Sequence, residues 1–302
     1  MTLFRRVLFP TDFSSYADAV ADCLPELRAA GAHEIVLMHV IRPGEVPLGH
    51  TVDQDLLERV RWGAEQKLHV LSMALEGQGF AVTSRLTEGR PAEEIVRLAG
   101  DERVNMIVLG AQGLTPAQEL LLGSVAFEVV RTSSVPVLIH KFELIRAMGR
   151  VECQRRCANT FARVLHPTDF SESAQAAFHI VKGLRGAGAE EVILLHVQDE
   201  RAMRHRPPEQ LAEFDQIDTA RLEQMRKALT LYHLNSRIML RHGISFLETL
   251  KVGVEEEISL IVLGWRGRSP LQEIFAGSTL ENVVRRSRRP VLVVPNPTEK
   301  LP

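Results

Sequence analysis

The two halves of the chain repeat one another, and this duplication restricts its possible folds more than any other feature. A shift of 157 positions aligns 4–40 with 161–197, and 20 of 37 residues are identical. A shift of 154 aligns 106–140 with 260–294, with 17 of 35 identical. Because a solenoid needs about three or more short repeats, two copies of roughly 140 residues predict a duplicated domain. The expected parts of the chain are two domains, 1–141 and 161–302, and a linker, 142–160.

Within each copy, short β-branched runs alternate with longer stretches of helical period. Runs that are apolar on both faces are typical of buried parallel strands. Five strands alternating with four helices predict an open, doubly wound sheet, so the fold class is α/β. We expect two tandem five-stranded parallel sheets of Rossmann-like type. In the first copy the expected strands are 5–9, 34–41, 80–86, 105–110 and 135–140, and the expected helices are 14–30, 53–76, 91–101 and 124–133.

Small residues gather where the fourth expected strand of each copy ends. Glycine at a strand end tolerates positive φ and lets backbone N–H groups approach a ligand closely. The pattern G-x2-G-x9-G-S occurs in both copies, and its last two residues open a helix, whose amino terminus favours anions. Because doubly wound sheets bind ligands at the carboxyl ends of their strands, the pattern predicts a phosphate cradle in each copy. Its residues are Gly110, Gly113, Gly123 and Ser124 in the first copy, and Gly264, Gly267, Gly277 and Ser278 in the second.

Three features together carry a family resemblance: PTDFS after the first strand, LMHV or LLHV in the second strand, and the glycine motif before the last helix. On these features the chain resembles the universal stress protein family, and in particular its tandem, nucleotide-binding members. The resemblance extends over nearly the whole chain. It implies an adenine nucleotide alpha hydrolase-like fold and a bound adenine nucleotide (ATP, or AMP or ADP), because members without nucleotide usually lack the long glycine motif.

The resemblance also implies roles for individual residues. Asp12 and Asp169, each at the end of a Pro-Thr-Asp sequence, would contact the nucleoside. The backbone of Val40 and Val197 would meet the adenine edge, and the glycine motif with the residue after it would hold the phosphates. The implied binding residues are Pro10, Thr11, Asp12, Val40, Gly110, Gly113, Gly123, Ser124 and Val125 in the first copy, and Pro167, Thr168, Asp169, Val197, Gly264, Gly267, Gly277, Ser278 and Thr279 in the second.

The two copies differ inside the glycine motif. The first copy has Ala111 and Gln112 after its first glycine, whereas the second has Trp265 and Arg266, with Arg268 following. Guanidinium groups that point toward phosphates add charge-assisted hydrogen bonds of ~1.5–3 kcal/mol each. We therefore expect the second copy to bind ATP more tightly, and solvated arginines on a loop are the alternative interpretation. Magnesium is expected with the nucleotide, because that ion prefers phosphate oxygens together with one or two carboxylates.

Composition excludes several classes of protein. The net charge of -2 argues against non-specific DNA binding and against a polybasic membrane patch. No apolar run approaches the ~18 residues of a membrane-spanning helix, and the first dozen residues lack the features of a secretion signal. Three cysteines are too few for a disulfide framework. We expect a cytoplasmic protein without nucleic-acid or membrane partners.

Other segments carry weaker expectations. The final strand of each copy is apolar and should lie at a sheet edge, where such strands invite pairing. The resemblance implies that this strand makes the dimer contact, so a tandem chain would pair internally as a pseudo-dimer, and a further homodimer stays open. The basic segment 141–163 is expected to be a solvated connection, and the spacing of Cys153 and Cys157 is a weak metal or redox signal. His39 and His196, at matching positions of the second strand, are expected to pack rather than bind ligand.

Three functions compete. A nucleotide-binding regulatory module of the stress response needs only the cradle. An enzyme, either a slow ATP hydrolase or a ligase, needs a nucleophile, a base or a lysine at the γ-phosphate. The chain has no G-x4-G-K-[ST] sequence, no lysine lies inside either glycine motif, and each site has one carboxylate, so we expect no catalytic residues. A structural stress protein with degenerate sites is the third interpretation.

Overall fold

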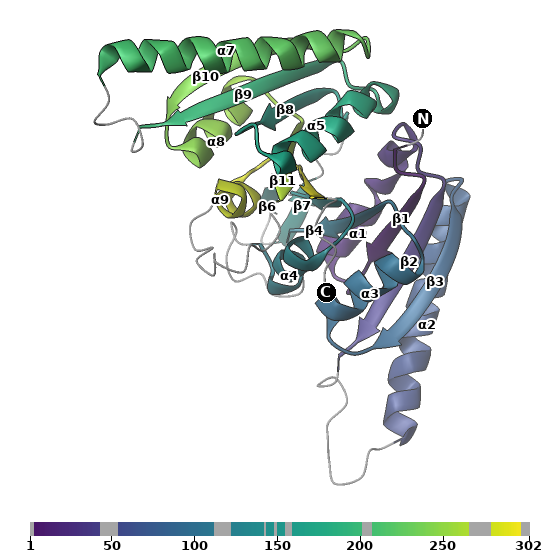
Figure 1. Cartoon of the computed structure of the whole chain (residues 1–302). Coiled ribbons are helices and arrows are strands. Elements are labelled where there is room, and N and C mark those ends of the chain that lie inside the picture. The colour runs from purple at the N-terminus through teal and green to yellow at the C-terminus, as the bar shows by residue number, and fades with distance from the viewer. Residues whose placement is uncertain are drawn as a thin grey trace. The chain divides into compact units, whose positions relative to one another are not determined.

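A computed structural model describes residues 3–42, 54–111, 122–141, 143–147, 150–154, 159–200, 207–265 and 279–296. The contacts divide the chain into two compact parts. We call Thr2–Arg156 the first unit and Cys157–Pro302 the second unit, and describe each by itself. In Figure 1 the first unit is coloured purple to teal and the second teal to yellow.

In both units the described residues form a sheet of five parallel strands in the same order. The order is β3-β2-β1-β4-β5 in the first unit and β10-β9-β8-β11-β12 in the second, as the sequence predicts for a doubly wound fold. The strands of the first unit are β1 (Arg6–Pro10), β2 (Glu34–Ile41), β3 (Ala81–Glu88), β4 (Met106–Gly110) and β5 (Val137–His140). Those of the second are β8 (Arg163–Pro167), β9 (Glu191–Asp199), β10 (Asn235–Gly243), β11 (Leu260–Trp265) and β12 (Val291–Pro295).

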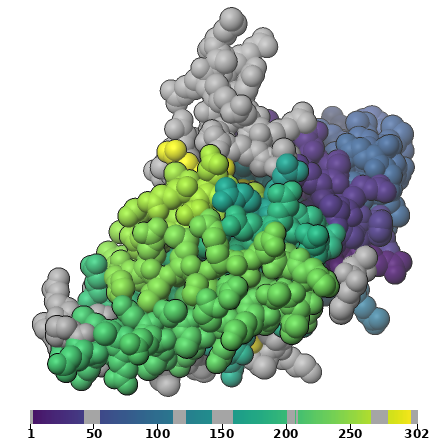
Figure 2. All heavy atoms as spheres, turned by 90° about the horizontal axis from the view of Figure 1, so that it is seen from above, coloured from purple at the N-terminus to yellow at the C-terminus, as the bar shows by residue number. Residues whose placement is uncertain are grey.

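Helices connect the strands and cover both faces of each sheet. Because parallel crossovers are right-handed, the reversal of strand order beside β1 places α1 and α2 on one face of the first sheet and α3 and α4 on the other. Figure 1 shows α2 and α3 on opposite sides of this sheet. Helix α7 covers the second sheet and forms much of the green surface in Figure 2. The helices are α1 (Ser15–Ala21), α2 (Gln54–Gly77), α3 (Pro91–Asp101) and α4 (Ser124–Thr132), then α5 (Glu172–Gly183), α7 (Pro208–Thr230), α8 (Ser245–Glu255) and α9 (Thr279–Arg286).

The helix expected at 14–30 is broken in the structure. It begins as expected, because the Ser14 hydroxyl accepts a hydrogen bond from the Ala17 N–H at 3.2 Å and caps α1. It ends at Ala21 and is followed by the 3₁₀ helix η1 (Leu24–Arg28). Proline removes a backbone donor and crowds the carbonyl four residues earlier, so Pro25, one of the first residues of η1, explains the break.

Two features of the fold were not expected from the sequence. The basic segment 141–163, expected to be a plain connection, contains an antiparallel pair of strands, β6 (Glu143–Ala147) and β7 (Arg150–Gln154), which belong to the first unit. Cys23, which is 1% exposed, is disulfide-bonded.

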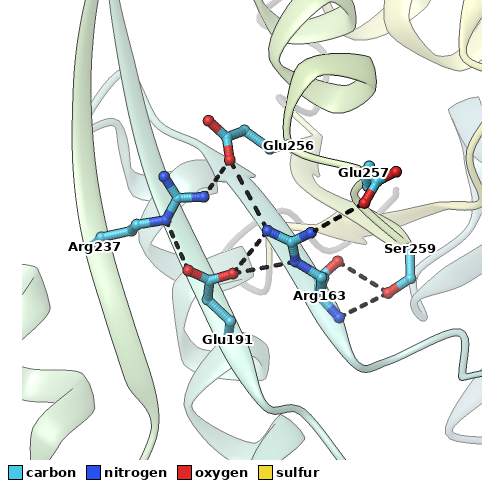
Figure 3. Close-up of polar contacts among 6 residues, drawn as sticks. All are labelled: Arg163, Glu191, Arg237, Glu256, Glu257 and Ser259. Atoms are coloured by element: carbon cyan, nitrogen blue, oxygen red, sulfur yellow. Dashed lines mark hydrogen bonds and ion pairs between the residues drawn. The ribbon is translucent and has the colours of Figure 1, made fainter.

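An ion-pair network fastens the amino-terminal ends of the second sheet. Figure 3 shows Glu191 between two arginines: its carboxylate accepts from Arg237 Nε at 2.7 Å and from Arg163 Nη2 at 3.1 Å. Arg237 also donates to Glu256, which follows α8, and this hydrogen bond holds the pKa of Glu256 below its usual value. The first unit repeats the arrangement with Arg6, Glu34, Arg85 and Glu102. The network therefore lies at the end of the sheet where the strands begin, opposite their carboxyl ends.

Replacing Arg237 with methionine is expected to lower the free energy of unfolding of the second unit by about 1 kcal/mol, the upper range for partly exposed ion pairs. Two carboxylates, those of Glu191 and Glu256, lose a partner in this variant. Urea denaturation in low salt and in 1 M NaCl measures the effect, which should shrink in high salt because exposed charges are screened. Arg241→Met is the control. It removes a single exposed ion pair, with Glu255, and should lower the free energy of unfolding by less.

Candidate functional site

A cavity opens at the carboxyl end of the first sheet, where the strand order reverses. Its volume is about 220 Å³, and its lining comes from the ends of β1, β2 and β4 and from the starts of α3 and α4. Such crossover points are where doubly wound sheets bind ligands. Of the first-unit residues that the sequence predicted for binding, those that lie in the cavity wall are Pro10, Thr11, Asp12, Val40, Gly110, Gly123, Ser124 and Val125. Gly113 lies outside the described residues.

The turn after β1 holds Asp12 through a chain of local hydrogen bonds. Asp12 Oδ1 accepts from the Ser14 N–H at 3.1 Å and from the Ser14 hydroxyl at 2.6 Å. Thr11 Oγ1 accepts from the Phe13 N–H at 3.0 Å, and Phe13 takes a left-handed φ of 57°. In the part of the chain that the structure describes, Asp12 Oδ2 has no hydrogen bond. One carboxylate oxygen thus fixes the turn, and the other is available to a ligand in the cavity.

His39 supports this turn from the neighbouring strand. Its Nδ1 lies 2.8 Å from the Thr11 carbonyl oxygen, which can only accept, so the Nδ1 proton points to the turn. The centre of its ring lies 4.3 Å from the centre of the Phe13 ring. Lys67, on α2, places its Nζ 5.2 Å from the centre of the Phe13 ring. The second unit repeats this arrangement with His196, Thr168, Phe170 and Arg221. The two histidines therefore pack and position the turn, as expected, and His39 also borders the cavity.

The amino terminus of α4 gives the cavity its anion-binding character. No side chain caps this helix, and its first three N–H groups, from Ser124 to Ala126, have no intrahelical acceptor. All three residues line the cavity. The Gly123 N–H donates to the Ala111 carbonyl at 2.7 Å, which fastens the start of the helix to the end of β4. Free amide donors and the positive end of the helix dipole together attract an anion.

The backbone angles of the described motif glycines are ordinary, and at Gly264 the glycine is needed for space. Glycine tolerates positive φ, but Gly123 has φ of -59°, and neither Gly110 nor Gly264 is among the described glycines with positive φ. At Gly264, an added Cβ would lie 2.1 Å from the Ser173 carbonyl oxygen at the start of α5. The close approach of that helix therefore requires the glycine, which is a packing role that the sequence did not reveal.

The second unit has the same turn after β8, and most of its glycine motif lies outside the described residues. The Asp169 carboxylate accepts from the Ser171 N–H at 3.0 Å, and Thr168 Oγ1 accepts from the Phe170 N–H at 3.0 Å, as in the first unit. Thr279 is the first residue of α9, and Val197 lies in β9 beside His196. The expected binding residues that lie outside the described part are Arg266, Gly267, Arg268, Gly277 and Ser278. The tighter binding expected of this unit therefore stays a prediction.

Sequence reasoning missed a buried polar group beside His196 in the second unit. Asp218 on α7, 9% exposed, accepts from Gln198 Nε2 at 3.0 Å and lies 3.3 Å from His196 Nε2. The positions of Gln198 and Asp218 correspond to Ile41 and Ala64 in the first unit, by the shifts of 157 and 154. The signal that could have revealed this group is a glutamine in a strand position that is apolar in the other copy.

Few ionisable side chains line the described part of the cavity. Asp12 is the one carboxylate in the cavity wall, and no lysine contributes to that wall as far as the structure describes it. Over the same described ranges, no cluster of three or more histidine, cysteine, aspartate or glutamate side chains could hold a metal ion. No helix in the described part combines the length and the apolar character needed to cross a bilayer.

Comparison with known proteins places both units in one family. The family described as "Universal stress protein family" matches residues 3–141 and 160–295. The universal stress protein MJ0577 of Methanocaldococcus jannaschii is 32% identical over 155 residues, which are 46% of this chain and 96% of that protein. A universal stress protein of Thermus aquaticus is 33% identical over 138 residues, 45% of this chain and 98% of its own length. Each of these relatives thus corresponds to one unit.

A solved structure matches the tandem arrangement. The crystal structure of a universal stress protein from Archaeoglobus fulgidus DSM 4304 is 26% identical, with a TM-score of 0.74. The match covers 98% of this chain and 97% of that one. Because the family match includes more than nine-tenths of the residues in both halves, and the repeated turn, glycine motif and strand order agree with it, the chain belongs to the universal stress protein family.

Proposed function

We propose that the chain is a nucleotide-dependent regulatory module that binds an adenine nucleotide, ATP or AMP or ADP, in the cavity of the first unit and at the corresponding strand ends of the second. The observation that carries this proposal is the convergence of three free α4 amides and the Asp12 carboxylate on one cavity at the strand-order reversal. A phosphate group matches the amides, and sugar hydroxyls match a carboxylate that can only accept. This chemistry fits a nucleotide better than an apolar ligand.

The ligand's orientation follows from the charges in the wall. Its phosphates would lie at Ser124 and Val125, where the N–H groups and the helix dipole point into the cavity. The ribose would lie beside Asp12 Oδ2, and the base would reach the backbone of Val40 at the end of β2. A Mg²⁺ ion bound with the nucleotide would neutralise phosphate charge, and Asp12 is the carboxylate in the wall that could serve it, directly or through water.

Binding without turnover agrees better with this wall than hydrolysis does. A phosphoryl-transfer enzyme positions the nucleophile and stabilises the developing charge with several groups. The wall of the described cavity has one carboxylate for this work. A slow ATP hydrolase is the alternative function, and a structural role with degenerate sites is the second. Freshly purified protein that releases stoichiometric, unhydrolysed ATP on denaturation would separate the binding module from both.

The end strands of the two sheets are our candidates for association. Within each unit β5 and β12 lie at the end of the strand order and consist mainly of apolar residues. Apolar end strands favour pairing with another strand. We propose that they serve a pseudo-dimer of the two units, with a homodimer as the alternative, and light scattering distinguishes the chain masses.

Gly123→Val tests the site directly. The new side chain would enter the cavity beside the α4 amides, and loss of one charge-assisted contact predicts at least about tenfold weaker binding of ATP at this site. Calorimetric titration of the full chain measures this loss. Gly100→Val, in the same unit but at a helix position where a Cβ meets nothing within 4 Å, is the matched control.

The same titration on Gly277→Val examines the second unit. A larger loss than with Gly123→Val would support the expected preference of the second unit for ATP, and a smaller loss would reverse that order. Unchanged affinity in both variants, with circular dichroism showing intact helices, would contradict the proposed function.

A further inference from the structure

Arg42 is a cation in the cavity wall that neither the glycine motif nor the strand-one turn predicts. It follows β2 by one residue, its side chain is exposed, and it lines the cavity. None of the hydrogen bonds or ion pairs among the described residues involves Arg42. A free guanidinium in a cavity wall offers five N–H donors to whatever occupies the cavity. Arg42 is therefore available to a ligand.

The strand order locates Arg42 relative to the anion-binding amides. In the sheet, β1 with Asp12 lies between β2 and β4, and α4 follows β4. Arg42 and the α4 amides therefore lie on opposite sides of Asp12. If the phosphates occupy the amides, the end of the nucleotide that reaches Arg42 is the base.

The second unit has the opposite charge at this position. The shift of 157 that aligns the two copies places Asp199 opposite Arg42, and Asp199 is the last residue of β9. The buried Asp218 carboxylate lies behind the same strand. The aligned position at the end of the second strand thus carries a donor in the first unit and an acceptor in the second.

We propose that Arg42 lets the first unit bind guanine as well as adenine nucleotides, an inference that rests on the proposed nucleotide binding. Arginine donates to the two acceptors on one edge of guanine, O6 and N7, whereas the matching edge of adenine combines the N7 acceptor with an amino group that donates. A guanidinium at the base end of the cavity therefore favours guanine. The second unit, which has Asp199 at the aligned position, lacks this donor.

The test compares ATP with GTP at one unit at a time. The full chain carrying Gly277→Val, which alters the second glycine motif, reports on the first unit, and Arg42→Asp is introduced in it. Because one good arginine–guanine pair discriminates by roughly tenfold or more, we expect GTP affinity to fall about tenfold further than ATP affinity. Arg59→Asp, an equal change of charge on α2 away from the cavity wall, should leave the GTP-to-ATP ratio unchanged.

The reciprocal variant is a gain of function. In the full chain carrying Gly123→Val, Asp199→Arg should raise the GTP-to-ATP affinity ratio of the second unit by about tenfold. Equal weakening of ATP and GTP by Arg42→Asp would overturn the proposal, because Arg42 would then serve the phosphates or the overall charge. An unchanged ratio in both variants would overturn it as well. If the parent chains bind neither nucleotide, the proposed function itself fails, which is a distinguishable result.

Discussion

Replacing Gly264 with alanine is expected to lower the free energy of unfolding of the second unit by about 3 kcal/mol or more. The alanine Cβ would lie 2.1 Å from the Ser173 carbonyl oxygen, 2.3 Å from the carbonyl carbon and 2.8 Å from the Ala174 nitrogen. These are backbone atoms at the start of α5, which cannot rotate aside as a flexible side chain would. The helix must shift away from β11, and urea denaturation followed by circular dichroism measures the cost.

Gly253→Ala is the matched control in the same unit. At this buried position in α8 an added Cβ meets only Ile261 Cδ1, at an ordinary contact distance of 3.8 Å. Alanine is favoured over glycine inside a helix by up to about 1 kcal/mol, so this variant should be neutral or more stable. Similar losses in both variants would show that the close approach of α5 is not what requires Gly264.

Replacing His166 with phenylalanine is expected to make the second unit more resistant to acid. His166 lies in β8, fully buried, with Nδ1 3.0 Å from the Val262 carbonyl oxygen and no partner for Nε2 in the described part of the chain. Burial lowers the pKa of His166 from 6.5 to about 4. The unfolded chain therefore binds a proton at a pH where the folded chain does not, and the stability that the neutral ring provides is lost as the pH falls from 6.5 toward 4.

The size of this effect follows from the pKa difference. One pKa unit corresponds to about 1.4 kcal/mol, so the loss reaches about 2 kcal/mol at pH 5 and about 3 kcal/mol near pH 4. Phenylalanine is the residue of the first unit at this position, Phe9, and packs there without exposure. The gain in unfolding free energy from His166→Phe should be about 2 kcal/mol larger at pH 5 than at pH 7.

The reciprocal change in the first unit completes the design. Phe9→His should make that unit acid-sensitive over the same range, because the new ring would be equally buried. Burial also lowers the pKa of His140, in the first unit, to about 4. Because His140 is present in both the parent chain and the His166→Phe variant, its contribution to acid sensitivity cancels when the two are compared. A gain from His166→Phe that does not change with pH would mean that the buried ring does not resist protonation.

Local patterns predicted most of the fold, and they failed where one residue overrides a pattern. The strand 34–41 and the helix 91–101 agree with β2 and α3 residue for residue, because an apolar run and an amphipathic stretch report burial on their own. The expected helix 14–30 ended at Ala21 because one proline outweighs the propensity of its neighbours. The strand pair β6–β7 was missed because charged residues interrupt both of its short strands.

The site was predicted in part for the same reason. Asp12 and Ser124 stand at a strand end and a helix start, and both positions are legible from the sequence. The close approach of Ser173 to Gly264 cannot be predicted from the sequence. The two residues are 91 positions apart and meet only because α5 packs on β11. Arg42 was missed because one charged residue after a strand has no pattern until the cavity shows where it lies.

The repeated sequence by itself determined that this protein has two α/β units with a nucleotide-like motif in each, because duplication, alternation of elements and glycine spacing are properties of neighbouring residues. Only the tertiary structure decided which atoms share a cavity, why Gly264 has no side chain, and that Arg42 lines the cavity of the first unit. Those relations depend on strand order and on the approach of distant helices, and they exist only once the chain has closed on itself.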